Sequence, residues 1–328
     1  MDYSIFSRED LGLGALCRRP YDLFVSCRNE SDRVVQVFDS VAAAEKIWVH
    51  HPEYGYGVNR NIASENNGTS SLLLPEGGSE FAQWMAFFQS LAGDLTGMRI
   101  CIDITGMMRP SVIVLPLVLK ELGIREADVL YSDPSYYARG SSTTFSKGDL
   151  KEVAIVPGAA GWSEPSGSVP ELTIIGAGYD HLLVRAVAES RQASEHLVMI
   201  GLPGLQPHMY QEGLYRLANV RESLRGFGKN NVLYAPASNP FMTAQVLSDA
   251  VGSRLSQGDL SLYLAPVGTK AQVLGFAWFF AVEGRELGAS VVFPYSQSYS
   301  AETSTGVGRI HRFTLELDEV ASLSTFSH

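Results

Sequence analysis

Two turns in the sequence combine residue types that can hold a phosphate group. In "LAPVGTKAQVLG" (264–275), an apolar run is followed by Gly268, Thr269 and Lys270. Glycine lets the backbone approach a ligand closely, and a hydroxyl and a cation near the start of a helix can bind an anion. The motif is not a Walker A loop, because the upstream glycine of that pattern is missing. We predict either a phosphate site or a plain capped turn here.

A related turn stands in the first half of the chain. In "IDITGMMRPSVIVLP" (102–116), Asp103 ends an apolar run, Thr105 lies in the turn, and Arg109 precedes a proline that suits the first turn of a helix. Backbone N–H groups, the Thr105 hydroxyl and the Arg109 guanidinium can together hold an anion. The alternative is that Asp103 or Thr105 only caps the following helix.

The stretch "IIGAGYDHLLV" places Asp180 directly before His181. A carboxylate and an imidazole can do acid–base work, although such a pair more often faces solvent at a helix start. The stretch also resembles a dinucleotide-binding fingerprint, but it stops at Gly176 and Gly178. No acidic residue closes the next strand, so we do not expect NAD, and no cofactor is predicted.

Other residues in matching turns could contact a base or a ribose. Asn239, in "ASNPFMT", either caps a helix or bonds the ligand, and Asn29, in "SCRNESD", is a second candidate. Tyr137 and Tyr295 lie in loops at corresponding places in the two halves. Their rings would suit stacking on bases, or they would pack the two halves together.

The elements that must position these residues recur along the chain. Residues 21–41 align with 171–191, each as an apolar strand, a polar turn and an amphipathic helix. Five further pairings follow in the same order: 45–57 with 195–207, 71–88 with 231–248, 99–110 with 260–271, 128–137 with 290–299, and 152–158 with 309–317. Their order and spacing indicate a tandem duplication. The alternatives are two unrelated α/β domains or one large sheet.

Each half is predicted as β-α-β-(loop)-β-α-β-α-β. Strands that are almost wholly apolar and alternate with helices are typical of a parallel sheet covered on both faces. We therefore predict an α/β fold of two tandem Rossmann-like units, doubly wound, mainly parallel and related by internal duplication. Their boundaries are 1–156 and 172–328, joined by a linker at 157–171 that is rich in Gly, Pro and Ser. Ligands of such sheets bind beyond the carboxyl ends of the strands, where the candidate turns fall.

Composition excludes several classes of protein. The 328 residues carry a formal net charge of −10, which repels a phosphate backbone, so no long nucleic acid is expected as a partner. Cys17, Cys27 and Cys101 are scattered, without a CxxC pair, which favours a reducing cytosol and argues against disulfides or a thiolate zinc site. The histidines show no metal-ligand spacing, so no metal is predicted.

The longest apolar runs, "VIVLPLVLK" and "VLGFAWFFAV", are too short to span a bilayer and are predicted to be buried helices. The polar N-terminus is unlike a signal peptide. We therefore predict a cytoplasmic protein without a membrane partner.

At "DITGMMRP" and "PVGTKAQVLG" the chain resembles CARF domains and the related SAVED domains of bacterial antiviral systems. Those domains are Rossmann-like, and their ligand-contacting turn often reads Asp-x-Thr-x-Gly-Thr-Lys before a helix. The first half keeps Asp103, Thr105 and the basic Arg109, whereas the second keeps Gly-Thr-Lys at 268–270. In the second half Leu264 stands where the Asp would be expected. SAVED proteins fuse two such units in one chain.

The resemblance implies a cyclic oligonucleotide second messenger as ligand. It also implies a protein partner that carries an effector activity, or cleavage of the ligand, because two Rossmann-like units fill this chain. Three hypotheses follow from the sequence. The protein is a binding module for a phosphate-rich nucleotide, an enzyme acting on a nucleotide or sugar phosphate with Asp180, His181 or Asp103 as acid and base, or a scaffold subunit whose turns only cap helices.

Overall fold

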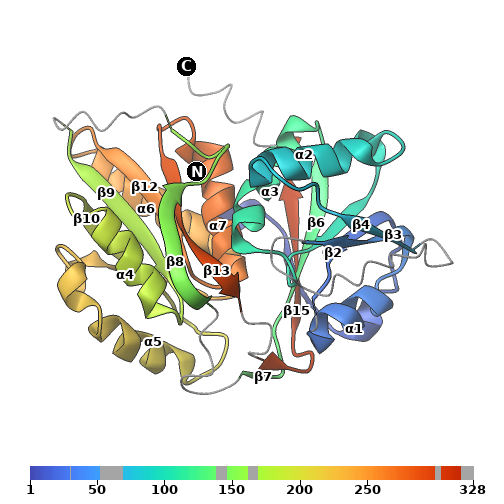
Figure 1. Ribbon diagram of the computed structural model, residues 1–328, viewed down its shortest axis with the longest axis horizontal. Coiled ribbons are helices and arrows are strands. Elements are labelled where there is room, and N and C mark those ends of the chain that lie inside the picture. The colour runs from blue at the N-terminus through green and yellow to red at the C-terminus, as the bar shows by residue number, and fades with distance from the viewer. Residues whose placement is uncertain (30, 52–68, 138–145, 162–168, 300–303, 319–328) are drawn as a thin grey trace. The chain divides into compact units, whose positions relative to one another are not determined.

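The computed structural model describes residues 1–29, 31–51, 69–137, 146–161, 169–299 and 304–318. The chain forms two compact units, and Figure 1 labels many of their helices and strands. We call residues 6–142 and 300–328 the N unit, and residues 1–5 and 143–299 the C unit.

In its described residues, the N unit has one large sheet and three α-helices. Its strands, in spatial order, are β1 (Arg8–Leu11), β15 (Ile310–Glu316), β6 (Glu126–Ser132), β5 (Ile100–Asp103), β2 (Tyr21–Cys27), β3 (Ala43–His50) and β4 (Thr69–Leu73). Its helices are α1 (Asp32–Ser40), α2 (Glu80–Ser90) and α3 (Arg109–Glu121). Strands β2 to β6 are parallel, and β15 runs antiparallel to both of its neighbours. A separate two-stranded ribbon joins β7 (Tyr136–Tyr137) and β14 (Ser304–Thr305).

The C unit is built on a second sheet. Its strands, in spatial order, are β11 (Val232–Ala235), β10 (Glu195–Gly201), β9 (Glu171–Ala177), β12 (Ser261–Pro266), β13 (Ser290–Tyr299) and β8 (Ser146–Ile155). Its helices are α4 (His181–Ser190), α5 (Met209–Ala218), α6 (Pro240–Leu255) and α7 (Lys270–Phe279), which continues as the π-helix η8 (Phe280–Gly284). Short 3-10 turns in the two units are η1 (Tyr3–Ile5), η2 (Leu13–Ala15), η4 (Leu95–Gly97), η6 (Arg221–Ser223) and η7 (Lys229–Asn231).

Both sheets have the same topology. Without β1, the strands of the N-unit sheet have the order 3-2-1-4-5-6 when they are counted along the chain. The C-unit sheet has the same order when its strands are counted from β9 and β8, which precedes β9 in the chain, is taken as the sixth. In both sheets the sixth strand is antiparallel to the fifth. The order 3-2-1-4-5-6 is the Rossmann order. The predicted α/β fold of two Rossmann-like, mainly parallel units is therefore confirmed, and matching strands such as β2 and β9 occupy equivalent places. In the C unit, the segment between β10 and β11 contains α5.

The sixth strands are exchanged between the two halves of the sequence. Strand β8 pairs with β13 of the C unit, and β15 pairs with β6 of the N unit. The observed division therefore differs from the predicted units 1–156 and 172–328, and β9 already begins within the predicted linker 157–171. The apolar pattern of a strand shows that it pairs, but not with which edge. Residues 162–168 of that linker lie outside the described residues.

Helices α3 and α7 form much of the two cores. Every side chain from Pro110 to Leu119 and from Ala271 to Phe279 is buried, which confirms that the longest apolar runs are buried helices. In α7, a Cβ on Gly275 would lie 2.4 Å from the Pro240 carbonyl oxygen, so this glycine allows α6 and α7 to pack closely. Within the described residues, none of the helices has both the length and the apolar character needed to cross a membrane.

Candidate functional site at the carboxyl edge of the N unit

Each sheet has a topological switch point, where neighbouring strands send their connections in opposite directions and where Rossmann folds bind ligands. It lies between β2 and β5 in the N unit, and between β9 and β12 in the C unit. A glycine sits at each point. A Cβ on Gly106 would lie 1.9 Å from the Cys27 carbonyl oxygen, and one on Gly178 would lie 2.6 Å from that of Val267. At both switch points, the strand-ending segments are thus in direct backbone contact.

The helices that begin at the two switch points differ in their caps. In the C unit, Asp180 caps α4 by accepting a hydrogen bond from Leu182 N, and Thr269 caps α7 in a reciprocal capping box. In the N unit, the N-cap residues of α1 and α3 are Ser31 and Met108, and neither makes a side-chain cap bond. The first N–H groups of a helix carry a partial positive charge and attract anions when no side chain occupies them.

A buried polar network connects the ends of β2, β5 and β6. Asp103 Oδ1 accepts a hydrogen bond from Thr105 N at 2.9 Å, and Oδ2 accepts one from Ser26 Oγ at 3.1 Å. Thr105 Oγ1 accepts from Ser132 N at 3.0 Å and lies 3.2 Å from Ser132 Oγ. All four residues are buried. Two predicted site residues, Asp103 and Thr105, therefore meet at the predicted edge of the sheet, and Asp103 holds the turn that contains Thr105.

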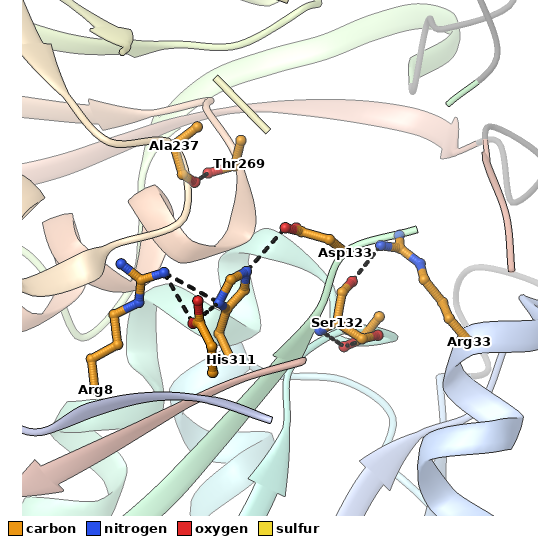
Figure 2. A network of polar contacts seen from close by, with 9 residues as sticks. Arg8, Arg33, Ser132, Asp133, Ala237, Thr269 and His311 are labelled. Carbon is orange, nitrogen blue, oxygen red and sulfur yellow. Dashed lines mark hydrogen bonds and ion pairs between the residues drawn. The ribbon is translucent and has the colours of Figure 1, made fainter. Parts of the chain in front are cut away.

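Arginines surround this edge. Arg33, in the first turn of α1, donates from Nη1 to the Ser132 carbonyl oxygen at 2.6 Å (Figure 2). Arg28 follows β2 and is exposed, and the predicted Arg109 begins α3 and is half-buried. The predicted Asn29 lies in the same β2–α1 turn, where Oδ1 accepts from Ser31 N at 3.0 Å. Sequence reasoning missed Arg33; the available signal was a basic residue in the first turn of a helix, where acidic residues are favoured.

A fully buried histidine lies at the β15 side of the same edge. His311 Nδ1 lies 2.6 Å from Asp10 Oδ1, and Nε2 lies 3.0 Å from Asp133 Oδ2 (Figure 2). His311 Nδ1 also lies 3.3 Å from Arg8 Nη2, so each ring nitrogen has a carboxylate oxygen beside it and Nδ1 has a guanidinium as well. Arg8 Nη2 also donates to Asp10 at 3.1 Å. Burial opposes it, but the hydrogen bond and charge of His311, together with Arg8, hold the pKa of Asp10 below its ordinary value. The sequence pattern had not connected these residues.

The predicted phosphate turn of the C unit has a capping arrangement. The Thr269 hydroxyl accepts from Gln272 N and donates to the Ala237 carbonyl oxygen at 2.5 Å (Figure 2). A Cβ on Gly268 would lie 2.7 Å from Gln272 Oε1, so glycine makes room for the capping box. Lys270 begins α7 and is half-buried. Thr269 thus caps α7, and a capped turn was the alternative that the sequence predicted beside a phosphate site.

The other predicted residues of the C unit also have local structural contacts. Asn239 caps α6, accepting from two backbone N–H groups at 3.1 and 3.2 Å. Asp180 is buried as the cap of α4, and His181 is the half-buried first residue of that helix. Tyr295 is half-buried in β13, with its ring centroid 5.4 Å from that of Phe293. All of these residues belong to the C unit.

One predicted site residue, Tyr137, has a side chain that lies outside the described part of the structure. The backbone of Tyr137 pairs with that of Ser304 in the β7–β14 ribbon.

Among the described residues, no group of three or more His, Cys, Asp or Glu side chains could hold a metal ion. A buried thiol–imidazole pair is present, with His51 Nε2 at 3.3 Å from Cys27 Sγ.

Comparison with known proteins identifies no family. No family model matches the chain, and no curated protein matches it. Among solved structures, the chain is similar to an N-terminal ketoreductase from a macrolactin assembly line, at 10% sequence identity and a TM-score of 0.22. The similarity covers 86% of this chain and 71% of the ketoreductase chain. The Rossmann-like class is defined here by the strand order of the two sheets.

Proposed function

We propose that this protein is a binding module for a phosphate-rich small ligand, held at the carboxyl edge of the N unit. One observation carries the proposal: both helices that begin at this switch point, α1 and α3, start without a side-chain cap. Their counterparts in the C unit, α4 and α7, are both capped. Two helix N-termini whose N–H groups are not taken by cap side chains form an anion site when they meet at one switch point.

Local charge supports an anionic ligand despite the net charge of −10. Arg28, Arg33 and Arg109 all lie at the start of α1 or α3 or in the turns that precede them. Guanidinium groups bind phosphate through directed hydrogen bonds, and a local cluster dominates over distant charges because salt screens the latter. In the C unit, Lys270 holds an equivalent place, at the first residue of α7.

The kind of ligand follows from the resemblance to CARF and SAVED domains. Asp103, Thr105 and Arg109 match their ligand-contacting turn, so we propose a cyclic oligonucleotide second messenger and a separate partner protein that carries the effector activity. The Asp103 carboxylate accepts hydrogen bonds from Ser26 and Thr105, which favours a positioning role over acid–base catalysis. Antiviral defence is the setting that the resemblance implies.

A thermal-shift screen tests this proposal. The panel contains cyclic di-, tri- and tetra-adenylates, NAD and sugar phosphates. A ligand present at 100 times its Kd adds about 2.7 kcal/mol to the free energy of unfolding, which is readily measured. We expect a shift with a cyclic adenylate and not with NAD or a sugar phosphate. A shift with either of the last two would favour the enzyme hypothesis, and no shift at all would contradict ligand binding.

Three variants locate the site. Arg33→Ala removes a guanidinium at the N-unit edge and is expected to weaken binding about tenfold, the effect of one charged hydrogen bond. Arg185→Ala is the matched control, because Arg185 also lies in the first helix of its unit and donates to a backbone carbonyl oxygen, that of Asn219. Binding that survives Arg33→Ala but is lost in Lys270→Ala would move the site to the C unit.

A further inference from the structure

One buried carboxylate oxygen at the N-unit edge makes no hydrogen bond to any described residue. It is Oδ1 of Asp133, the residue that follows β6, and Asp133 is only 4% exposed. Oδ2 of the same carboxylate lies 3.0 Å from His311 Nε2 (Figure 2). Buried polar atoms nearly always have a partner, because leaving one without a hydrogen bond costs free energy. Oδ1 is therefore an acceptor without a hydrogen-bond partner among the described residues.

Asp133 lies directly beside the arginine of the proposed phosphate site. The carbonyl oxygen of the preceding residue, Ser132, accepts from Arg33 Nη1 at 2.6 Å. Within the part of the chain that the structure describes, Arg33 Nε also makes no hydrogen bond. The chain that covers Asp133 reaches the surface, since Ser135 and Gly308 are exposed and Gly308 N donates to the Asp133 carbonyl oxygen at 2.7 Å. A cationic donor and an anionic acceptor thus adjoin at this edge.

The charges around Asp133 select the kind of group that it can accept. The carboxylate is already paired with His311, and Arg33 contacts the neighbouring residue. A cationic ligand group would be repelled by the Arg33 guanidinium. A neutral hydrogen-bond donor has no such penalty and satisfies Oδ1. Nucleotides carry two donors of this kind, the ribose hydroxyls and the exocyclic amino groups of the bases.

We propose that Asp133 Oδ1 accepts a hydrogen bond from a neutral donor of the ligand, while Arg33 binds a phosphate of the same molecule. The inference rests on the proposed function and deepens it, because it names the residue that distinguishes nucleotides from other phosphates. Asp133 is then a specificity-determining residue. His311 is a positioning residue, because its Nε2 lies 3.0 Å from Oδ2 of the Asp133 carboxylate.

Calorimetric titration of cyclic di-, tri- and tetra-adenylate into the wild type, Asp133→Asn and Asp10→Asn tests this inference. Asp10→Asn is the matched control, because it removes the other carboxylate at His311 but leaves Asp133 unchanged. Asp133→Asn is expected to weaken binding at least about tenfold, as for a charged hydrogen bond, and Asp10→Asn to stay within about twofold of the wild type.

Ligand analogues identify the donor and do not depend on the folding of any variant. The same rings are titrated with 2′-deoxyribose in place of ribose, and with purine in place of adenine. The analogue that lacks the donor should bind the wild type about tenfold more weakly than the parent ring does. The Asp133→Asn variant should bind this analogue and the parent ring with equal affinity, because the interaction is already lost.

Three results would overturn the inference while leaving the proposed function intact: equal affinity of the wild type and Asp133→Asn, equal losses in both carboxylate variants, or full affinity of both analogues for the wild type. If none of the rings binds the wild type, the proposed function and this inference fail together.

Discussion

The two switch points of this protein share a backbone design and differ in the chemistry placed on it. Both lie in sheets of the same strand order, and both have a glycine in contact with a neighbouring carbonyl oxygen. In the N unit the ladder pairs Ser26 with Asp103, whereas the equivalent pair in the C unit is Gly176 with Pro266. The N unit thus carries a buried polar network and helices without side-chain caps. After duplication, the fold restricts the backbone far more strictly than the polar side chains at the strand ends.

Removing β15 is expected to produce the largest difference in stability between the N unit and the C unit. A chain that ends at residue 299 keeps every element of the C unit, but β1 and β6 lose the strand between them. Buried Phe313 and Leu315 are lost as well. We expect the N unit to unfold while the C unit stays folded. Hydrogen exchange should show that protection is lost in β2 and kept in β9; protection kept in β2 would show that the N unit is complete without the exchanged strand.

The next largest effects are expected from the two switch-point glycines. A Cβ on Gly106 would lie 1.9 Å from a backbone carbonyl oxygen, compared with 2.6 Å for Gly178. Backbone cannot move aside as a flexible side chain can, so we expect Gly106→Ala to cost about 3 kcal/mol or more and Gly178→Ala about 1–3 kcal/mol. Urea unfolding measures both. Gly77→Ala serves as the control for space, because a Cβ at this position would have nothing within 4 Å, although its φ of +80° adds its own strain.

A smaller difference in stability is expected between variants of the two polar turn residues, Asp103 in the N unit and Thr269 in the C unit. Asp103→Ala leaves the buried Ser26 hydroxyl and Thr105 N–H without their acceptor, which should cost about 2–4 kcal/mol. Thr269→Ala removes a helix cap and should cost about 1 kcal/mol. Comparing the denaturation midpoints of the two variants tests this ranking. If Thr269→Ala proved the more costly, the hydroxyl bond to Ala237 would outweigh the buried network.

The two units should also respond differently to acid. His196 in β10 accepts from Arg225 N at 2.9 Å and lies 3.1 Å from the Arg191 carbonyl oxygen, and burial lowers its pKa. The unfolded chain then binds a proton that the folded chain does not, so stability of the C unit falls as the pH drops below about 6.5. Asp10 also has a lowered pKa, but its contribution is kept above about pH 3.9 and lost below it.

Hydrogen exchange at pH 7.5 and 5.5, corrected for intrinsic rates, checks the acid response. Protection in β10 should fall more than protection in β3. His196→Gln should reduce this difference, because it removes the titrating group while keeping a side chain that can donate and accept. An equal fall in both strands for the wild type would contradict the assignment.

Much of the fold could be predicted because it depends on patterns local in the chain. Apolar runs alternating with amphipathic helices indicated parallel sheets, and six paired segments indicated the duplication. The partner of each final strand could not be predicted, because β8 and β15 carry the same alternation whichever sheet they complete. The exact alignment of the two halves could not be predicted either. The sequence alignment matched Leu264 with Asp103, whereas the pairing of the strands in the two sheets places Pro266 in the position equivalent to Asp103.

The site was predicted in part for the same reason. Asp103 and Thr105 stand out because a polar residue that ends a buried strand is rare, and Asn239 and Thr269 stand out as helix caps. Asp133, His311 and Asp10 lie far apart in the sequence, and no spacing rule connects them. The sequence by itself determined the two sheets and the turns that end their strands, through the periodicity of burial. Only the tertiary structure decided which charges meet at the edge, because the exchanged strand β15 brings His311 beside Asp133.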